Sequence, residues 1–118
     1  MASIHELIER GLQRTLEALV FAADTPVAAR DVADVYAEVT GEDRPSEKQV
    51  EEAVARLNRL YEESDRVFRI EEWAGGYRMA TEKAVSPFLK AYFNREQEQR
   101  ISRSLMETLS IVAYRQPV

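Results

Sequence analysis

The spacing of apolar residues changes once along this chain, near residue 65, and that change limits the fold more than any other feature. Before it, apolar residues recur every three or four positions, which places them on one face of a helix. After it, from Val67 to Thr81, residues alternate in the way typical of a half-buried strand. The sequence therefore predicts helices first and a β-hairpin after them, an α+β fold.

Three helices are predicted before the change of period. The first ends at Thr25-Pro26, because proline cannot continue the helical hydrogen-bond pattern. The second covers residues 29–39 and ends at Gly41, a residue that readily forms a left-handed cap. The third covers residues 46–63, where Ser46 and Gln49 have the spacing of a capping box. The apolar stripe of the first helix consists of Ile4, Leu7, Ile8, Leu12, Leu16, Leu19 and Val20.

A hairpin is predicted around Gly75-Gly76, which we expect to form its turn because glycine tolerates positive φ. Alternating residues precede this turn from Phe68 and follow it as far as Thr81. Three helices followed by a hairpin is the order of a winged helix-turn-helix fold. In that fold the third helix is the usual recognition helix and the hairpin is the wing.

The C-terminal part predicts further helical structure. Ser86-Pro87 suits a helix start, and a short helix is expected over residues 87–93. Residues 94–100 contain no apolar side chain, so we interpret 94–101 as an exposed polar linker, which can itself be helical. A further amphipathic helix is expected over residues 102–118, and its apolar face consists of Leu105, Leu109, Val112 and Ala113.

The charge distribution disfavours a DNA-reading role. The net charge is −5; residues 1–65 hold seven Lys/Arg against fifteen Asp/Glu, and residues 66–118 hold nine against six. Residues 46–65, the expected recognition helix, hold three basic against six acidic residues, so phosphates would repel them. Weak nonspecific DNA contact stays open for the basic residues of the wing and beyond: Arg66, Arg69, Arg78, Lys83, Lys90 and Arg95. The charges therefore favour a winged helix that binds other proteins. The alternative is a winged-helix transcriptional regulator that binds DNA as a dimer.

Three stretches of the chain carry a resemblance to a known family: residues 16–27 (LEALVFAADTPV), residues 75–81 (GGYRMAT) and residues 101–118 (ISRSLMETLSIVAYRQPV). They resemble the segregation and condensation protein B (ScpB) family, the bacterial partner of the Smc ATPase and its kleisin. Their order and spacing cover nearly the whole chain. Ala28 departs from the family, which often has a serine-like cap at this place.

The resemblance implies a homodimer formed largely through the first winged helix, and a kleisin (ScpA-like) segment that wraps across the dimer and links it to Smc. It implies a non-catalytic part in chromosome partition during the cell cycle and cell division. It also implies a first winged-helix domain over residues 1–93, the linker 94–101, and the first helix of a second winged-helix domain over residues 102–118. We therefore expect this chain to be a fragment of a longer protein.

Ile4, Ile8 and Leu12 are candidate interface residues. They lie towards the free end of the first helix, which is long for a winged helix, and an exposed apolar strip usually marks an interface. The alternative is that they pack on the short helix at residues 87–93. In a dimer, we expect the partner chain to bury some of them.

Trp73 and Tyr77 flank the predicted turn and are the other candidate interface residues. Both residue types are common at binding hot spots, because they bury a large area with few rotatable bonds. The alternative is that Trp73 folds back over the hairpin and the third helix.

Catalytic, cofactor and metal sites are not predicted. His5 is the only histidine and cysteine is absent, so neither a nucleophile–histidine pair nor a Cys/His metal site can be assembled. The adjacent Glu pairs at 51–52, 62–63 and 71–72 point in different directions along a helix or strand. The sequence has no apolar run long enough for a membrane span and no secretion signal, so we expect a cytoplasmic protein.

Overall fold

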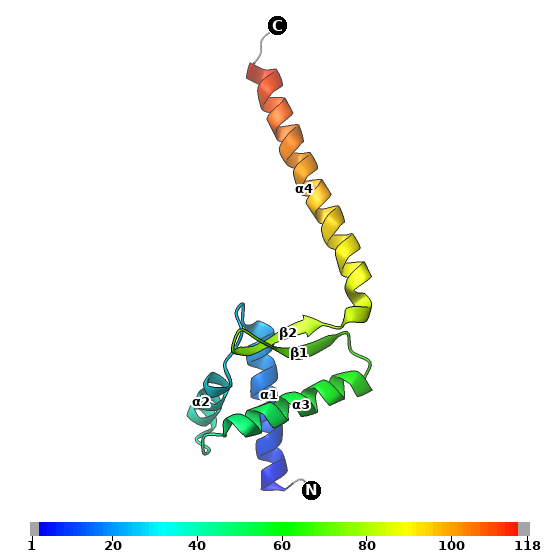
Figure 1. Cartoon of the computed structure of the whole chain (residues 1–118). Coiled ribbons are helices and arrows are strands. Elements are labelled where there is room, and N and C mark those ends of the chain that lie inside the picture. Colours follow the sequence, from blue (N-terminus) through cyan, green and yellow to red (C-terminus); the bar gives the residue numbers. More distant parts are fainter. Residues whose placement is uncertain (1–2, 116–118) are drawn as a thin grey trace. The chain divides into compact units, whose positions relative to one another are not determined.

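The computed structural model describes residues 3–115, without the side chains of residues 4, 5, 7 and 109–115. It divides into two compact units, Met1–Glu82 and Lys83–Val118. The first contains α1 (Ile4–Ala22), α2 (Ala29–Thr40), α3 (Glu47–Glu63) and the hairpin strands β1 (Phe68–Trp73) and β2 (Gly76–Thr81) (Figure 1). This order confirms the predicted α+β winged-helix fold.

The helices of the first unit meet around one apolar core. Leu16 of α1, Val32 of α2 and Val50 of α3 are the largest fully buried side chains, so each helix contributes to the centre. Leu16 belongs to the stripe predicted for the first helix, and Val32 and Val50 recur with apolar neighbours at the same three- and four-residue spacing. The hairpin completes the core with Ile70 and Tyr77. Exclusion of this apolar surface from water is the main force that holds the unit together.

The helix ends follow the predicted caps. Ser46 and Gln49 form both halves of the capping box at α3: Gln49 N–H donates to Ser46 Oγ at 3.1 Å, and Ser46 N–H donates to Gln49 Oε1 at 2.9 Å. Gly41 caps α2 with φ 72°, the left-handed conformation. Ala28 precedes α2 without a side-chain cap, as its departure from the family pattern suggested. α1 ends at Ala22, shortly before Thr25-Pro26.

The turn of the hairpin lies one residue earlier than predicted. Trp73 pairs with Gly76, so the turn residues are Ala74 and Gly75, with φ 52° and 81°. Gly76 is needed for a different reason: a Cβ atom there would lie 2.9 Å from the backbone C and O of Val27. The prediction treated Gly76 as a turn residue because the sequence does not show which segment approaches it.

The second unit contains a short 3₁₀ helix, Lys83–Val85, and the helix α4 (Ser86–Arg115). The structure corrects the predicted division of this region, because one helix runs through residues 87–93, 94–101 and 102–115. The segment 94–101 contains neither glycine nor proline, and nothing in it ends a helix. It is largely exposed, as its polar composition suggests. Leu109, Val112 and Ala113 have side chains outside the described part, and the domain boundaries taken from the resemblance stay a prediction.

Candidate protein-binding surfaces

The outward face of α3 is acidic. α3 buries Val50, Ala53, Val54, Leu57 and Tyr61 in the core, which leaves its charged side chains outside. Glu47, Glu51 and Glu52 are exposed along its first half, with Lys48 among them. A helix placed in a major groove would bring these carboxylates towards the phosphates. The geometry therefore places negative charge where a DNA-reading winged helix needs positive charge.

The apolar strip of α1 is partly used by the chain's own core. Leu12 is 4% exposed and belongs to the core, and Ile8 is half-buried and packs against it. Tyr36 of α2 donates a hydrogen bond from its hydroxyl to the backbone O of Ile8 at 3.3 Å, which ties the two helices together. The side chain of Ile4 lies outside the described residues. The interface role of this strip stays a prediction.

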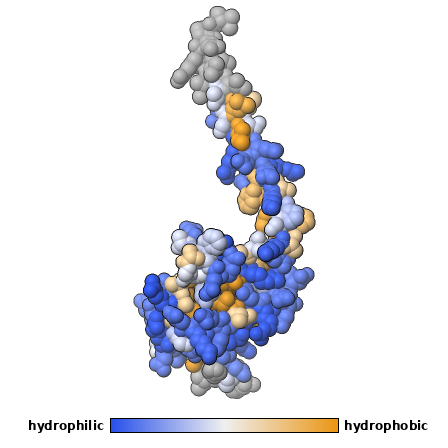
Figure 2. All heavy atoms as spheres, in the orientation of Figure 1, coloured by the Kyte–Doolittle hydropathy of each residue, from blue (hydrophilic) through white to orange (hydrophobic). Residues whose placement is uncertain are grey.

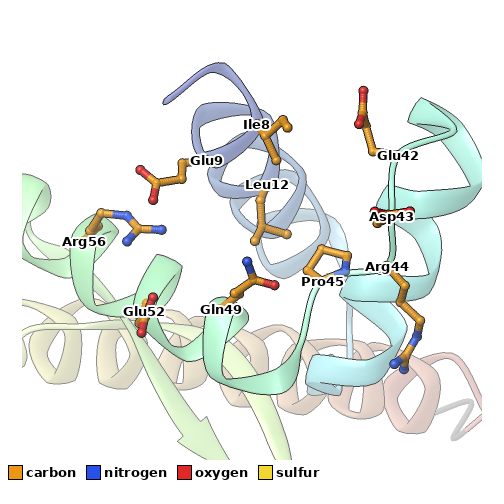
Figure 3. A pocket seen from close by; sticks show the side chains of 10 residues that line it. All are labelled: Ile8, Glu9, Leu12, Glu42, Asp43, Arg44, Pro45, Gln49, Glu52 and Arg56. Carbon is orange, nitrogen blue, oxygen red and sulfur yellow. The ribbon is translucent and has the colours of Figure 1, made fainter. Parts of the chain in front are cut away.

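A hollow of about 270 Å³ lies beside this strip, between α1, the loop after α2 and α3 (Figure 3). Ile8, Leu12 and Pro45 give it an apolar floor. Arg44 on its rim is held by Asp34, with 2.5 Å between Nε and Oδ1. The rim is mostly acidic, so this hollow is unsuited to an anionic ligand. Its charged lining residues are Glu9, Glu42, Asp43, Arg44, Glu52 and Arg56.

Trp73 stands at the tip of the hairpin and stays 54% exposed. The guanidinium carbon of Arg78 lies 4.0 Å from the centre of its ring, a cation–π contact. Glu71 holds Arg78 in turn, with 2.6 Å between Nη2 and Oε1. Arg78 and Glu71, on the same face of the sheet, thus orient the indole, while more than half of the surface of Trp73 remains exposed for contact with a partner.

Tyr77 has a different environment from Trp73, although both flank the turn. It is 6% exposed and packs in the core. Burial raises the pKa of its hydroxyl, and the carboxylates of Glu72, Glu51 and Glu47 raise it further. Its backbone pairs with Val27. In this structure Tyr77 therefore stabilises the fold, and its interface role stays a prediction.

The sequence interpretation did not single out Phe21, an exposed aromatic residue near the end of α1. It is 78% exposed and lines a hollow of about 370 Å³ together with Trp73, Met79 and Pro26. Its position was the available signal, because Phe21 follows Val20 directly and so lies about 100° away from the buried stripe. An aromatic residue off the stripe of an amphipathic helix indicates a surface with another use.

Among the side chains that the structure describes, which do not include that of His5, no three acidic residues gather in a way that could hold a metal ion. No helix in the described part is long and apolar enough to cross a membrane.

The fold and these surfaces define the class of the protein: it is a winged-helix protein with an acidic third helix and exposed aromatic residues beside its wing. A family model described as "Segregation and condensation complex subunit ScpB" matches residues 14–118. The chain therefore belongs to the ScpB family. Segregation and condensation protein B of Moorella thermoacetica is 36% identical over 107 residues, which are 91% of this chain and 51% of that protein.

Solved structures agree with the family. A crystal structure of a conserved hypothetical protein from Chlorobium tepidum has a TM-score of 0.69 and 35% identity, covering 96% of this chain and 67% of that one. A crystal structure of a dimer of an ScpB N-terminal domain complexed with an ScpA peptide has a TM-score of 0.54 and 25% identity. The match covers 67% of this chain and 84% of that one. The chain spans about half the length of the curated relatives it matches.

Proposed function

We propose that this chain is a non-catalytic subunit of a condensin-like Smc–kleisin complex, which forms a homodimer and binds an ScpA-type kleisin in chromosome segregation and condensation. The observation that carries the proposal is the similarity to an ScpB N-terminal domain that is dimeric and complexed with an ScpA peptide. The compartment proposed is the cytoplasm, where a bacterial chromosome lies.

The acidic face of α3 supports a protein partner over a nucleic acid. Counterion release by Lys and Arg drives binding to a duplex, and α3 has few such residues outside the core. Exposed aromatic side chains of the first unit support the same conclusion, because aromatic residues are enriched in protein interfaces. We propose interface contacts at Ile4, Ile8, Leu12, Trp73 and Tyr77.

Co-purification with the ScpA protein of the same species tests the proposal. Tagged ScpA should retain this chain at physiological salt, and sedimentation at tens of micromolar should show a dimer. A chain that sediments only as a monomer and is not retained by ScpA contradicts the proposal. A full-length ScpB relative is the reference, since this chain spans about half the length of the curated relatives it matches.

The variant Trp73→Ala tests the exposed indole. Because Trp73 is 54% exposed, its loss should leave the melting temperature nearly unchanged while it weakens ScpA binding or dimerisation by more than tenfold, about 1.4 kcal/mol. A variant that loses thermal stability and keeps its affinity would show that the indole only serves the fold.

The alternative, a DNA-binding regulator, predicts a different salt response. Such a protein binds a specific duplex at physiological salt and loses affinity steeply as salt rises. We expect only weak, sequence-independent binding, which the basic residues after residue 65 would supply. Specific binding to a duplex that charge reversal on α3 abolishes would favour the regulator.

A further inference from the structure

The two outer edges of the hairpin differ in their backbone partners. Tyr77 exchanges hydrogen bonds with Val27 outside the hairpin, at 2.8 Å from its N–H and 2.9 Å to its C=O. Outward-facing backbone groups recur at every second residue of a strand. In the observed register the outward pairs are therefore Glu72–Tyr77, Ile70–Met79 and Phe68–Thr81.

Side chains close most of the β1 edge. Asn58 of α3 meets both outward groups of Ile70: it accepts from the N–H at 2.8 Å and donates to the C=O at 2.9 Å. Arg69 donates from Nη1 to the C=O of Phe68 at 2.7 Å. An added strand would have to displace these contacts, so the β1 edge is blocked.

The β2 edge is open beyond its first position. In the described part of the chain, Val27 pairs with Tyr77 alone, as an isolated bridge. Among the described residues, no partner outside the hairpin meets the outward N–H and C=O groups of Met79 and Thr81. Unpaired edge groups are a template for another extended chain.

The hollow beside Phe21 borders this open edge. Met79 lines it together with Trp73, Phe21 and the residues before Val27. A strand added next to β2 would direct alternate side chains towards this hollow. The charged residues in its lining are Asp24 and Arg78, one of each sign, which suits an apolar side chain better than a charged one.

We propose that the β2 edge at Met79 and Thr81 receives an extended segment of the partner protein by strand addition, with one apolar side chain of that segment seated between Phe21 and Trp73. The inference rests on the proposed function, because the segment belongs to the ScpA-type kleisin. Val27 already pairs with Tyr77 on this edge, and the partner segment would pair with the next outward-facing residues, Met79 and Thr81. Backbone hydrogen bonds give the affinity in this mode, and the hollow selects the side chain.

Proline substitution tests the edge, because proline removes a backbone donor and is tolerated where the N–H faces outward from a sheet. Thr81→Pro removes an outward N–H from β2, and its ring occupies the place of an added strand. Glu72→Pro is the matched control, since it removes an outward N–H from the exposed end of the β1 edge. Thr81→Pro should weaken ScpA binding at least tenfold, roughly 1.4 kcal/mol, and Glu72→Pro less than twofold.

A second pair of variants tests the hollow without changing the backbone. Phe21→Ser should weaken ScpA binding by roughly tenfold, as expected for an aromatic contact. Val39→Ser is its control, because Val39 is 79% exposed, similar to Phe21 at 78%, and lies on α2 away from the hollow. If circular dichroism shows that Thr81→Pro does not fold, the comparison of Phe21→Ser with Val39→Ser tests the proposal instead.

Amide hydrogen exchange by NMR separates the outcomes. With saturating ScpA, the amides of Met79 and Thr81 should become protected while that of Glu72 does not. If the wild type binds ScpA and Thr81→Pro and Phe21→Ser bind as tightly, the edge is not the site and the proposed function stands. If the wild type does not bind ScpA, both proposals fail. Protection that grows with the concentration of this chain alone would mean that a second copy occupies the edge, which overturns the inference.

Discussion

The two units of this chain use apolar residues in opposite ways. In the first unit they meet around a shared core, and Leu16, Val32 and Val50 are fully buried. In the second unit most of the large apolar side chains described on α4 are exposed, and Figure 2 shows apolar surface along this helix interrupted by hydrophilic stretches. Similar residue types thus stabilise one unit and leave a surface for contacts on the other. The exposed ones on α4 are Phe88, Tyr92, Phe93, Ile101, Leu105 and Met106.

Truncation of matched leucines is the strongest test of this contrast. Leu16→Ala should lower the free energy of unfolding by about 3–5 kcal/mol, because it leaves a cavity in the core. Leu105→Ala on α4 should change it by less than about 0.5 kcal/mol, since that side chain is 57% exposed. Urea unfolding followed by circular dichroism measures both. A similar cost at the two positions would mean that the face of α4 is covered in solution.

The close approach of Gly76 to Val27 provides the next largest effect. Gly76→Ala should destabilise the first unit by about 1–3 kcal/mol, because the added methyl group meets backbone atoms that cannot move without breaking the Val27–Tyr77 bridge. Thermal unfolding measures it. Ala84→Gly in the second unit is the control for a change of one methyl group, and an equal loss there would remove the steric explanation.

The hydroxyl of Tyr61 links α3 to α1, since it donates a hydrogen bond to Glu17. Tyr61→Phe should cost about 1–2 kcal/mol at pH 7, because a charged acceptor loses its donor. The pKa of Tyr61 is raised, first by burial and then by Glu17. The contribution is therefore complete below the unfolded pKa of about 10 and is lost as pH rises above it. Unfolding between pH 7 and 11 should show a steeper alkaline loss for the wild type than for Tyr61→Phe.

The capping box at α3 gives a smaller effect. Ser46→Ala should lower the free energy of unfolding by about 1 kcal/mol, because the N–H of Gln49 loses its acceptor. Restoring a cap with Ser46→Asp should recover most of the loss, which separates capping from any change in packing. Equal destabilisation by both variants would contradict the capping account.

The smallest expected effect lies on α4. Arg100 and Glu96 form an ion pair one turn apart, with 3.5 Å between Nη2 and Oε1. Glu96→Gln should change the free energy of unfolding by about 0.5 kcal/mol or less, because solvent screens exposed pairs. Urea unfolding in low and high salt checks this. A loss above 1 kcal/mol would indicate that Glu96 has a partner beyond its own helix.

Much of the fold was predictable because it depends on local patterns. The stripes of α1, α2 and α3, the capping box at Ser46 and the left-handed cap at Gly41 all follow from residue types at fixed spacings. The continuity of α4 was harder to predict, because a polar segment without glycine or proline fits an exposed helix as well as a linker. Only the absence of a helix-ending residue favoured the helix.

The candidate surfaces were predictable only in part, since exposure depends on what packs nearby. Trp73 and Tyr77 look equivalent beside the turn, yet one is exposed and the other is buried. Leu12 is buried in the core of the single chain, which its place in the apolar strip did not reveal, and its interface role stays a prediction. Phe21 was overlooked, although its place off the buried stripe was visible.

The sequence by itself determined the elements of the first unit and their order, the acidic charge of the third helix and the family, because these depend on residue types along the chain. The tertiary structure decided which edge of the hairpin is closed, since Asn58 binds Ile70 twelve residues further along the chain and Val27 pairs with Tyr77 from a distant segment. Contacts between distant segments leave no period in the sequence. For this reason the open edge at Met79 and Thr81 could be found only in the folded chain.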